Sequence, residues 1–189
     1  MEGHIVKFDL DQFIDDVKRA RSEHAGQAAV QEVLARAVSD PGAVIDGIGA
    51  PTQAGVHTIL HEQDLTILNV VWAPLMQLLP HDHRMWASIG IYTGREDNIL
   101  WQRSGSTVKA DRAASLSERE VFPLPADAIH SVTNPIKRLT GAIHVYGGDF
   151  FTTPRSEWDA ETLLERRFDL EAARQSFKDA TERFSAGQR

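Results

Sequence analysis

Apolar positions divide the chain into a helical start, a strand-rich middle and a helical end. Near the start, apolar residues recur three or four positions apart over 10–17 and again over 30–38, which is the spacing of amphipathic helices. An Asp-Pro-Gly turn signal at 40–42 is expected to end the second helix, and a loop rich in Gly and Pro follows over 46–55. The start of the chain therefore predicts two helices and then a loop.

Between about Leu65 and Phe151 the apolar period shortens to two, in runs rich in β-branched and aromatic residues. Six strands are predicted: Thr66–Trp72, Trp86–Thr93, Ile99–Arg103, Glu120–Leu124, Ile129–Thr133 and Ala142–Tyr146. Turn residues rather than helix-length patterns separate them, so we expect an antiparallel sandwich or small barrel. After Pro154 a helical stripe predicts a last helix on the outside of that barrel; its members are Ala173, Phe177, Ala180 and Phe184.

The length of 189 residues suits one domain. We expect an all-β core with flanking α-helices, divided into a helical N-terminal extension over 1–55, a β-barrel core over 56–153 and a C-terminal helix over 154–189.

Charge and residue usage narrow the function. Twenty basic against 27 acidic residues give a formal charge of −7, and no basic stripe is present, so nucleic acid is not an expected partner. No apolar run reaches the roughly 18 residues needed to cross a bilayer, and the first residues do not resemble a signal peptide, so we expect a cytoplasmic protein without a membrane partner. The chain has no cysteine, so any metal must be held by His, Asp or Glu.

Four histidines in the strand-rich region carry the chemistry. His81 and His83 are two residues apart, and such positions on a strand project from the same face, as two ligands of one ion must. His130 lies in the predicted strand 129–133 and His144 in the strand that follows a turn-rich connection. We predict that these two strands form a hairpin with His130 opposite His144. The alternative for each histidine is a surface or satisfied core position.

Two longer patterns give a family resemblance. His81-x-His83 is followed by a turn glycine at Gly94, and later the chain reads Pro-x-Asp-x-x-His-x-x-x-Asn from Pro125 to Asn134. These resemble the two motifs of the cupin superfamily, with aspartate where the second motif usually has glycine. The resemblance implies a cupin double-stranded β-helix.

The first motif lacks the glutamate ligand common in cupins, since its position falls on Ala87 or Ser88. A cupin metal held by three histidines alone is similar to that of the cysteine dioxygenase group, the mononuclear non-haem iron thiol dioxygenases. A late His-x-Tyr strand, here with His144 and Tyr146, also resembles that group. The resemblance implies that Fe(II) is the cofactor and that His144 and Tyr146 act catalytically beside the substrate. Its implied iron ligands are His81, His83 and His130.

The chain also departs from that group. The segment 55–65 holds no arginine, whereas those enzymes commonly bind the amino-acid carboxylate with an arginine before the metal strands. A cysteine–tyrosine crosslink is excluded because the chain has no cysteine, and Ala142 stands where a serine is usual. A carboxylate substrate such as cysteine is therefore expected to lack its arginine partner.

The residues themselves leave alternatives open. Three neutral imidazoles leave a divalent ion its full charge and open positions, which suits Fe(II), but three histidines also hold Zn, and Ni or Mn are further alternatives. We interpret His144 as a base that lies next to the metal ligands without binding the metal itself. The alternatives are a fourth metal ligand or a packed core residue. Tyr146 shares its face by the period of two and is otherwise a residue that fills the barrel.

The remaining polar residues are expected at the surface. Glu96 and Asp97 follow the turn at Gly94, where acidic side chains are usually solvated, and Arg84 should point away from the histidines by alternation. Four further histidines are also assigned to the surface: His4, His24, His57 and His61.

These observations predict a metal-dependent cupin oxidoreductase, a dioxygenase that oxidises a small thiol or other chelating metabolite with O2. The expected partners are that small-molecule substrate and O2, and a homo-oligomer stays open. One alternative is a zinc- or manganese-dependent isomerase or hydrolase, in which the metal polarises a carbonyl. The other is a cupin that binds a small molecule without catalysis, because fold alone does not choose among these.

Overall fold

The computed structural model describes residues 8–24 and 26–186. Three helices come first, and they are α1 (Leu10–Arg21), α2 (Gly26–Val38) and α3 (Pro41–Ile48). The first strands are β1 (Gly55–His61), β2 (Thr66–Trp72), β3 (Gln77–Asp82), β4 (Ala87–Thr93), β5 (Arg95–Ser104) and β6 (Thr107–Ser117). The others are β7 (Val121–Leu124), β8 (Ile129–Thr133), β9 (Thr140–Tyr146), β10 (Ser156–Trp158) and β11 (Glu165–Arg167), and α4 (Leu170–Ala186) follows.

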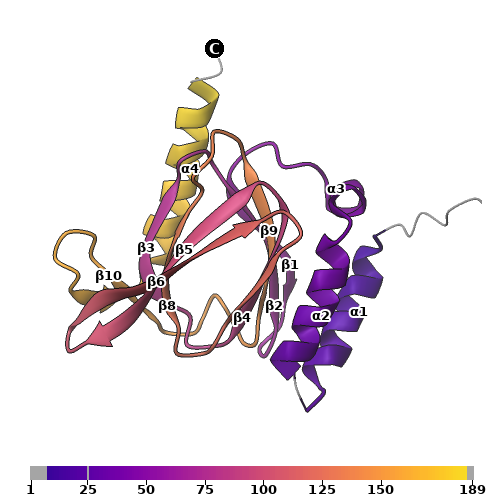
Figure 1. Ribbon diagram of the computed structural model, residues 1–189, viewed down its shortest axis with the longest axis horizontal. Helices are drawn as coiled ribbons and strands as arrows, with labels where there is room; N and C mark the ends of the chain where they lie inside the picture. The colour runs from indigo at the N-terminus through magenta and orange to yellow at the C-terminus, as the bar shows by residue number, and fades with distance from the viewer. Residues whose placement is uncertain (1–7, 25, 187–189) are drawn as a thin grey trace, which may run out of the picture.

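The strands form two antiparallel sheets. One has five strands in the order β1-β2-β9-β4-β7, and the other has six in the order β11-β10-β3-β8-β5-β6. From β2 to β10 the chain passes repeatedly from one sheet to the other, which winds it around a common core (Figure 1). The expected double-stranded β-helix with flanking helices is therefore confirmed.

The central strands of the five-stranded sheet, β2, β9 and β4, are buried on both faces. The outer face of this sheet lies under α1 and α2, where Ile143 and Val145 of β9 pack with Leu34 of α2 (Figure 1). A Cβ added to Gly90 of β4 would lie 2.7 Å from Leu34 Cγ, so glycine is what lets α2 approach this closely. The inner face packs against the six-stranded sheet around Leu68 and other apolar residues.

The N-terminal prediction needs one correction, because the segment expected to be a turn and a loop contains α3. Asp40 is the N-cap of this helix, with its side chain accepting a hydrogen bond from the Ala43 amide, and Pro41 occupies the first turn. An Asp-Pro pair ends one helix and equally well starts another, since proline is favoured at the first helical position.

Other differences concern the strands. Five were not predicted from the sequence, and they are β1, β3, β6, β10 and β11. Two of them, β10 and β11, lie within 154–189, so the strands continue beyond the boundary at 153 and only 170–186 is helical. The Phe177 side chain of α4 packs on Trp72 at 5.1 Å between ring centroids, so α4 reaches the core between the sheets instead of lying only on the outside.

The turn at Gly94 is as expected, since its backbone adopts φ +86°, which glycine tolerates best. Among the described helices, none is both long enough and apolar enough to span a membrane.

Candidate metal centre

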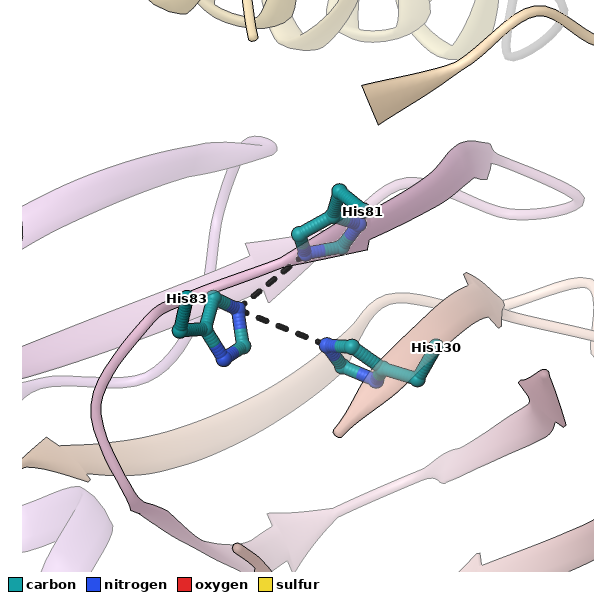
Figure 2. A group of neighbouring side chains, drawn as sticks. All are labelled: His81, His83 and His130. Carbon is teal, nitrogen blue, oxygen red and sulfur yellow. Dashed lines mark hydrogen bonds between the residues drawn. The ribbon is translucent and has the colours of Figure 1, made fainter. Parts of the chain in front are cut away.

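Three predicted ligands meet between the sheets. His81 lies on β3 directly across from His130 on β8, and His83 is the first residue after β3. All three side chains are buried, and one ligand nitrogen from each lies within 4.8 Å of the others. Figure 2 shows the three imidazole rings converging from the two segments. In the described part of the chain, this is the one such group of three or more His, Cys, Asp or Glu side chains.

Hydrogen bonds fix which nitrogen faces the centre of this group. His81 Nδ1 lies 2.8 Å from the Leu79 carbonyl oxygen, and His130 Nδ1 lies 2.7 Å from Asn98 Oδ1. Because both partners are acceptors, each Nδ1 carries the proton and each Nε2 keeps a lone pair. His83 Nε2 lies 3.1 Å from His81 Nε2 and 3.4 Å from His130 Nε2 (Figure 2).

This donor set fits a divalent cation. The Nε2 atoms of the three histidines face one another, and of these only His83 Nε2 can carry a proton. This one proton cannot satisfy both other nitrogens, so at least one lone pair directed at the centre has no hydrogen to accept. Two imidazole nitrogens about 2.1 Å from one ion, at angles of about 90–110°, lie about 3.0–3.4 Å apart, which matches the two distances above. That the three histidines bind metal stays a prediction, which this geometry supports.

Burial keeps the three imidazoles neutral, as metal ligands must be. It lowers the pKa of His81 to about 4, with Arg155 and His144 nearby adding to the effect. Burial also lowers the pKa of His83 and of His130 well below the usual value, and the neighbouring histidines act in the same direction. At neutral pH the cluster therefore presents nitrogen lone pairs and no net charge.

A cavity of about 310 Å³ opens from the three histidines. Its walls are mainly apolar, with Leu68 and Trp72 from one sheet, Val132 from the other and Phe177 from α4. This volume is at the lower end for ligand sites, so the cavity suits a small molecule.

His144 and Tyr146 also line this cavity, both from the inner face of β9. His144 Nδ1 lies 3.0 Å from the Tyr146 hydroxyl, and the tyrosine ring stands edge-on to His83 at 5.0 Å between centroids. Burial raises the pKa of Tyr146, so its hydroxyl stays protonated. The structure thus brings both residues beside the three histidines, while their catalytic role stays a prediction.

The predicted hairpin is wrong. β8 pairs with β3 and β5 in one sheet, and β9 pairs with β2 and β4 in the other, so His130 and His144 are not ladder partners. The side-chain amide of Asn134 donates to three carbonyl oxygens, those of Trp72, Ala73 and Arg138, and holds the connection in a crossing between sheets. Both histidines nevertheless line the cavity, each from its own sheet.

Arg155 is a cavity residue that the sequence did not reveal. Its side chain is 7% exposed and lies between the Phe150 and Phe168 rings, with its guanidinium carbon 4.0 and 4.3 Å from their centroids. Its Nη1 donates to the Phe150 carbonyl oxygen at 2.6 Å, but its buried Nε has no partner. Burial lowers the pKa of this guanidinium, against the opposing effect of Asp82. Among the described residues, no carboxylate lies within ion-pair distance of it, since Asp82 pairs with Arg84 instead.

The cavity is cationic although the chain is acidic. Arg174 and Lys178 of α4 also line it, and no Asp or Glu is among its described lining residues. The segment 55–65 contributes no arginine to the cavity, as expected, but Arg155, which comes after the histidine-bearing strands in the sequence, lies in the cavity wall. Only the fold shows this, since the sequence gives Arg155 no motif.

Glu96 also differs from expectation. It was assigned to a solvated turn, but its side chain is fully buried on β5, and its oxygens accept from Trp72 Nε1 and Asn98 Nδ2 at 2.9 Å each. Its alternation with Asn98 and Leu100 on one strand face was the signal for this position. Asp97 has a partly exposed side chain paired with Arg95, as a solvated residue would be.

The other surface assignments agree with the structure where it describes them. Arg84 is half-exposed and forms an ion pair with Asp82, and His24, His57 and His61 are exposed. His4 lies outside the described residues.

Comparison with known proteins gives only distant matches. No protein-family model matches the chain. A solved RmlC-like cupin family protein with a double-stranded β-helix fold from Methanocaldococcus jannaschii is 14% identical over 54% of this chain and 85% of its own, with a TM-score of 0.45. A cupin superfamily protein from Desulfitobacterium hafniense DCB-2 is 14% identical over 53% of this chain and 84% of its own, with a TM-score of 0.42.

Oxalate oxidase in complex with the substrate analogue glycolate is 17% identical over 52% of this chain, with a TM-score of 0.41. That match takes in 53% of the oxalate oxidase chain. The fold assignment rests on the strand order described above, and no activity is transferred from these structures.

Proposed function

We propose that the protein is an Fe(II)-dependent oxygenase that oxidises a small anionic metabolite, a thiol or another metal-chelating compound, with O2. For a thiol, uptake of one O2 gives the sulfinic acid. The observation that carries the proposal is the convergence of His81, His83 and His130 on a largely apolar cavity that also contains the buried cation of Arg155.

The neutral histidines support this choice of chemistry. They would hold the ion without neutralising its charge, so the ion attracts an anionic donor such as a thiolate. Because all three histidines come from β3, its end and β8 of the six-stranded sheet, an ion held by them would face the cavity, where substrate and O2 could reach it. When bound there, Fe(II) supplies the redox chemistry that O2 requires.

The cations around the cavity support the substrate class. Arg155 offers a planar guanidinium with a free buried Nε–H, which suits a carboxylate. The Phe150 and Phe168 rings fix its plane, so little freedom is lost when an anion binds. Arg174 and Lys178 would raise the local concentration of anions at the mouth. A molecule with a donor at one end and a carboxylate at the other fits this arrangement.

Tyr146 and His144 would orient the reactants. The Tyr146 hydroxyl stays protonated and is tied to His144 Nδ1, so it presents a polar group in a fixed position beside the three histidines. Fixed groups of this kind need little reorganisation during the reaction. The largely apolar walls, to which Phe177 of α4 contributes, would limit the access of water to the reacting atoms.

The test is oxygen uptake by Fe(II)-loaded protein with a panel of small thiols, half with a carboxylate and half without. We expect a change in the iron spectrum on anaerobic mixing with at least one carboxylate-bearing thiol, followed by O2 consumption on exposure to air. No O2 uptake across the panel contradicts the oxygenase, and stoichiometric zinc in the purified protein favours the hydrolase or isomerase instead.

Arg155→Met tests the anionic substrate. This change keeps an unbranched side chain between the two rings and removes the charge, so KM for carboxylate substrates should rise at least tenfold. Arg174→Met is the matched control at the mouth, where the arginine is half-exposed and paired with Glu171, and it should change KM by less than about threefold. Equal effects of the two variants would contradict the assignment of Arg155 as the anchor.

A further inference from the structure

Glu96 is a buried carboxylate without a lysine or arginine partner. Its side chain is fully buried on β5, and the one basic nitrogen within ion-pair distance in the described residues is His144 Nε2, 3.6 Å from Oε2. A buried carboxylate is costly unless hydrogen bonds compensate it. One side chain, Asn98, separates Glu96 from His130, and its neighbours Trp72 and His144 line the cavity.

Both carboxylate oxygens have fixed partners. Trp72 Nε1 donates to Oε2 at 2.9 Å, and Asn98 Nδ2 donates to Oε1 at 2.9 Å. The indole nitrogen can only donate, and the asparagine amide has a donor end and an acceptor end. These two neighbours therefore require an acceptor on each side, which the two oxygens of a carboxyl group provide and a side-chain amide, with a single oxygen, does not.

The Asn98 contact extends to a predicted metal ligand. Because Asn98 directs its NH2 group to Glu96, its Oδ1 faces His130 Nδ1 at 2.7 Å. That oxygen accepts only from a protonated Nδ1, which leaves the His130 Nε2 lone pair for the metal. Glu96 therefore determines, through the orientation of the Asn98 amide, which nitrogen of His130 carries the proton.

The second Glu96 oxygen, Oε2, faces His144, which lines the cavity. His144 Nε2 is buried and has no hydrogen-bond partner within normal distance, and Glu96 Oε2 is the acceptor that it faces at 3.6 Å. An Nε2–H directed at this carboxylate leaves Nδ1 as the acceptor for the Tyr146 hydroxyl, 3.0 Å away.

We infer that Glu96 is a positioning residue that determines where two buried histidines carry their protons. Its Oε1 acts on His130 through Asn98, and its Oε2 acts directly on His144, which in turn accepts from the Tyr146 hydroxyl. The inference rests on the proposed function for the metal itself, but the tautomer of His130 is a property of the metal-free protein and is tested separately.

Glu96→Gln breaks this arrangement without changing volume. One amide oxygen cannot accept from both Trp72 and Asn98, and the indole cannot turn around. Asn98 must therefore flip, its NH2 group then faces His130 Nδ1, and His130 moves its proton to Nε2. We expect at least a tenfold loss in Zn2+ affinity, measured by calorimetry with Zn2+ as the probe, which is the scale for lost partners of metal ligands.

Two further variants separate orientation from charge. Asp97→Asn removes the same charge from the next residue of β5, where the carboxylate pairs with Arg95, and it should leave Zn2+ affinity within about twofold. In the double variant with Glu96→Gln and Trp72→Phe, the glutamine oxygen is free to accept from Asn98. The Zn2+ affinity of this double variant should therefore be close to that of Trp72→Phe alone. Unchanged affinity in Glu96→Gln, or no recovery in the double variant, overturns the inference.

Nitrogen NMR of labelled histidine in the metal-free protein supplies a readout that needs neither metal nor activity. His130 should carry its proton on Nδ1 in the unaltered protein and on Nε2 in Glu96→Gln. A wild-type His130 with its proton on Nε2 overturns the inference, even if the variant does not fold. If the wild-type protein shows the expected tautomers but takes up no metal, the role of Glu96 is supported and the proposed function is contradicted.

Discussion

The two faces of the five-stranded sheet use the same strands for different purposes. On β9, Ile143 and Val145 point outward under the N-terminal helices, whereas His144 and Tyr146 point into the cavity. The outer cluster contains apolar side chains almost throughout, and the cavity side combines apolar walls with histidines, a tyrosine and buried charges. One strand therefore contributes to stability with one set of alternate residues and to the candidate site with the other.

The comparison shows why the site can be polar. A cavity lined with buried polar groups gains less from burial than an apolar core does, and its groups need specific partners. The helices on the outer face add apolar contacts that leave the inner face free for polar residues. Changes on the cavity side should thus alter binding and turnover, and changes on the outer side should alter stability.

The largest effect is expected from His130→Ala or His81→Ala on the cavity side. Each removes one of three ligands, so metal content should fall at least tenfold and O2 uptake should disappear, while the fold persists because its outer core is unaffected. Metal analysis and far-UV circular dichroism measure both quantities. Full metal content in both variants would contradict the three-histidine site.

Tyr146→Phe should have the next largest effect. It removes one hydroxyl and little volume, so turnover should fall about 100-fold if that hydroxyl orients the reactants, with metal content unchanged. Steady-state O2 uptake measures turnover, and thermal melting controls for stability. A variant that loses about 1 kcal/mol of stability and works normally would make Tyr146 a core residue.

Ile143→Ala tests the outer face beside these residues. Removing a buried side chain under α2 should lower the free energy of unfolding by about 3 kcal/mol, since the cavity left behind cannot fully collapse. Metal affinity should stay within about twofold of the unaltered protein. Ile143→Val, which removes one methylene group, should cost about 1 kcal/mol. A stable Ile143→Ala variant that loses metal would break the division between the two faces.

The smallest expected effect is a loss of folding stability at acidic pH. Burial lowers the pKa of His81 to about 4, below the ordinary value of about 6.5 in an unfolded chain, so the unfolded state binds more protons between these values. The stability of the metal-free protein should therefore fall as the pH drops from 7 to 5, by about 1–2 kcal/mol from this residue. Urea unfolding at both pH values measures the loss. The loss should be smaller in His81→Asn, and an equal loss there would contradict the assignment.

Local patterns were enough to predict much of the fold. Alternation gave β2 and β8 with their observed bounds, and it placed His81 and His83 on one side of the chain. Such patterns are strong where one strand faces a core, because a shift by one residue would turn every side chain to the wrong face. Alternation joined only His81 and His83, and His130 was added to them by the resemblance of the pattern from Pro125 to Asn134 to the second cupin motif.

Long-range partners were not predictable from local patterns. β6 is an edge strand with mostly exposed residues, so it has little apolar alternation to detect. The crossing of the chain at Asn134 depends on carbonyl groups some 60 residues earlier in the sequence, which a hairpin model ignores. Arg155 and Glu96 belong to no motif, and only the folded chain places them beside the histidines.

The proposed function requires that His81, His83 and His130 hold one catalytic metal in the cavity that they line. Metal analysis of the protein purified without added metal tests it most directly, with His83→Ala prepared in parallel. The account predicts about one iron per chain in the unaltered protein and a loss of at least tenfold in the variant. Absence of any divalent metal from the unaltered protein, or equal metal in both preparations, would contradict it.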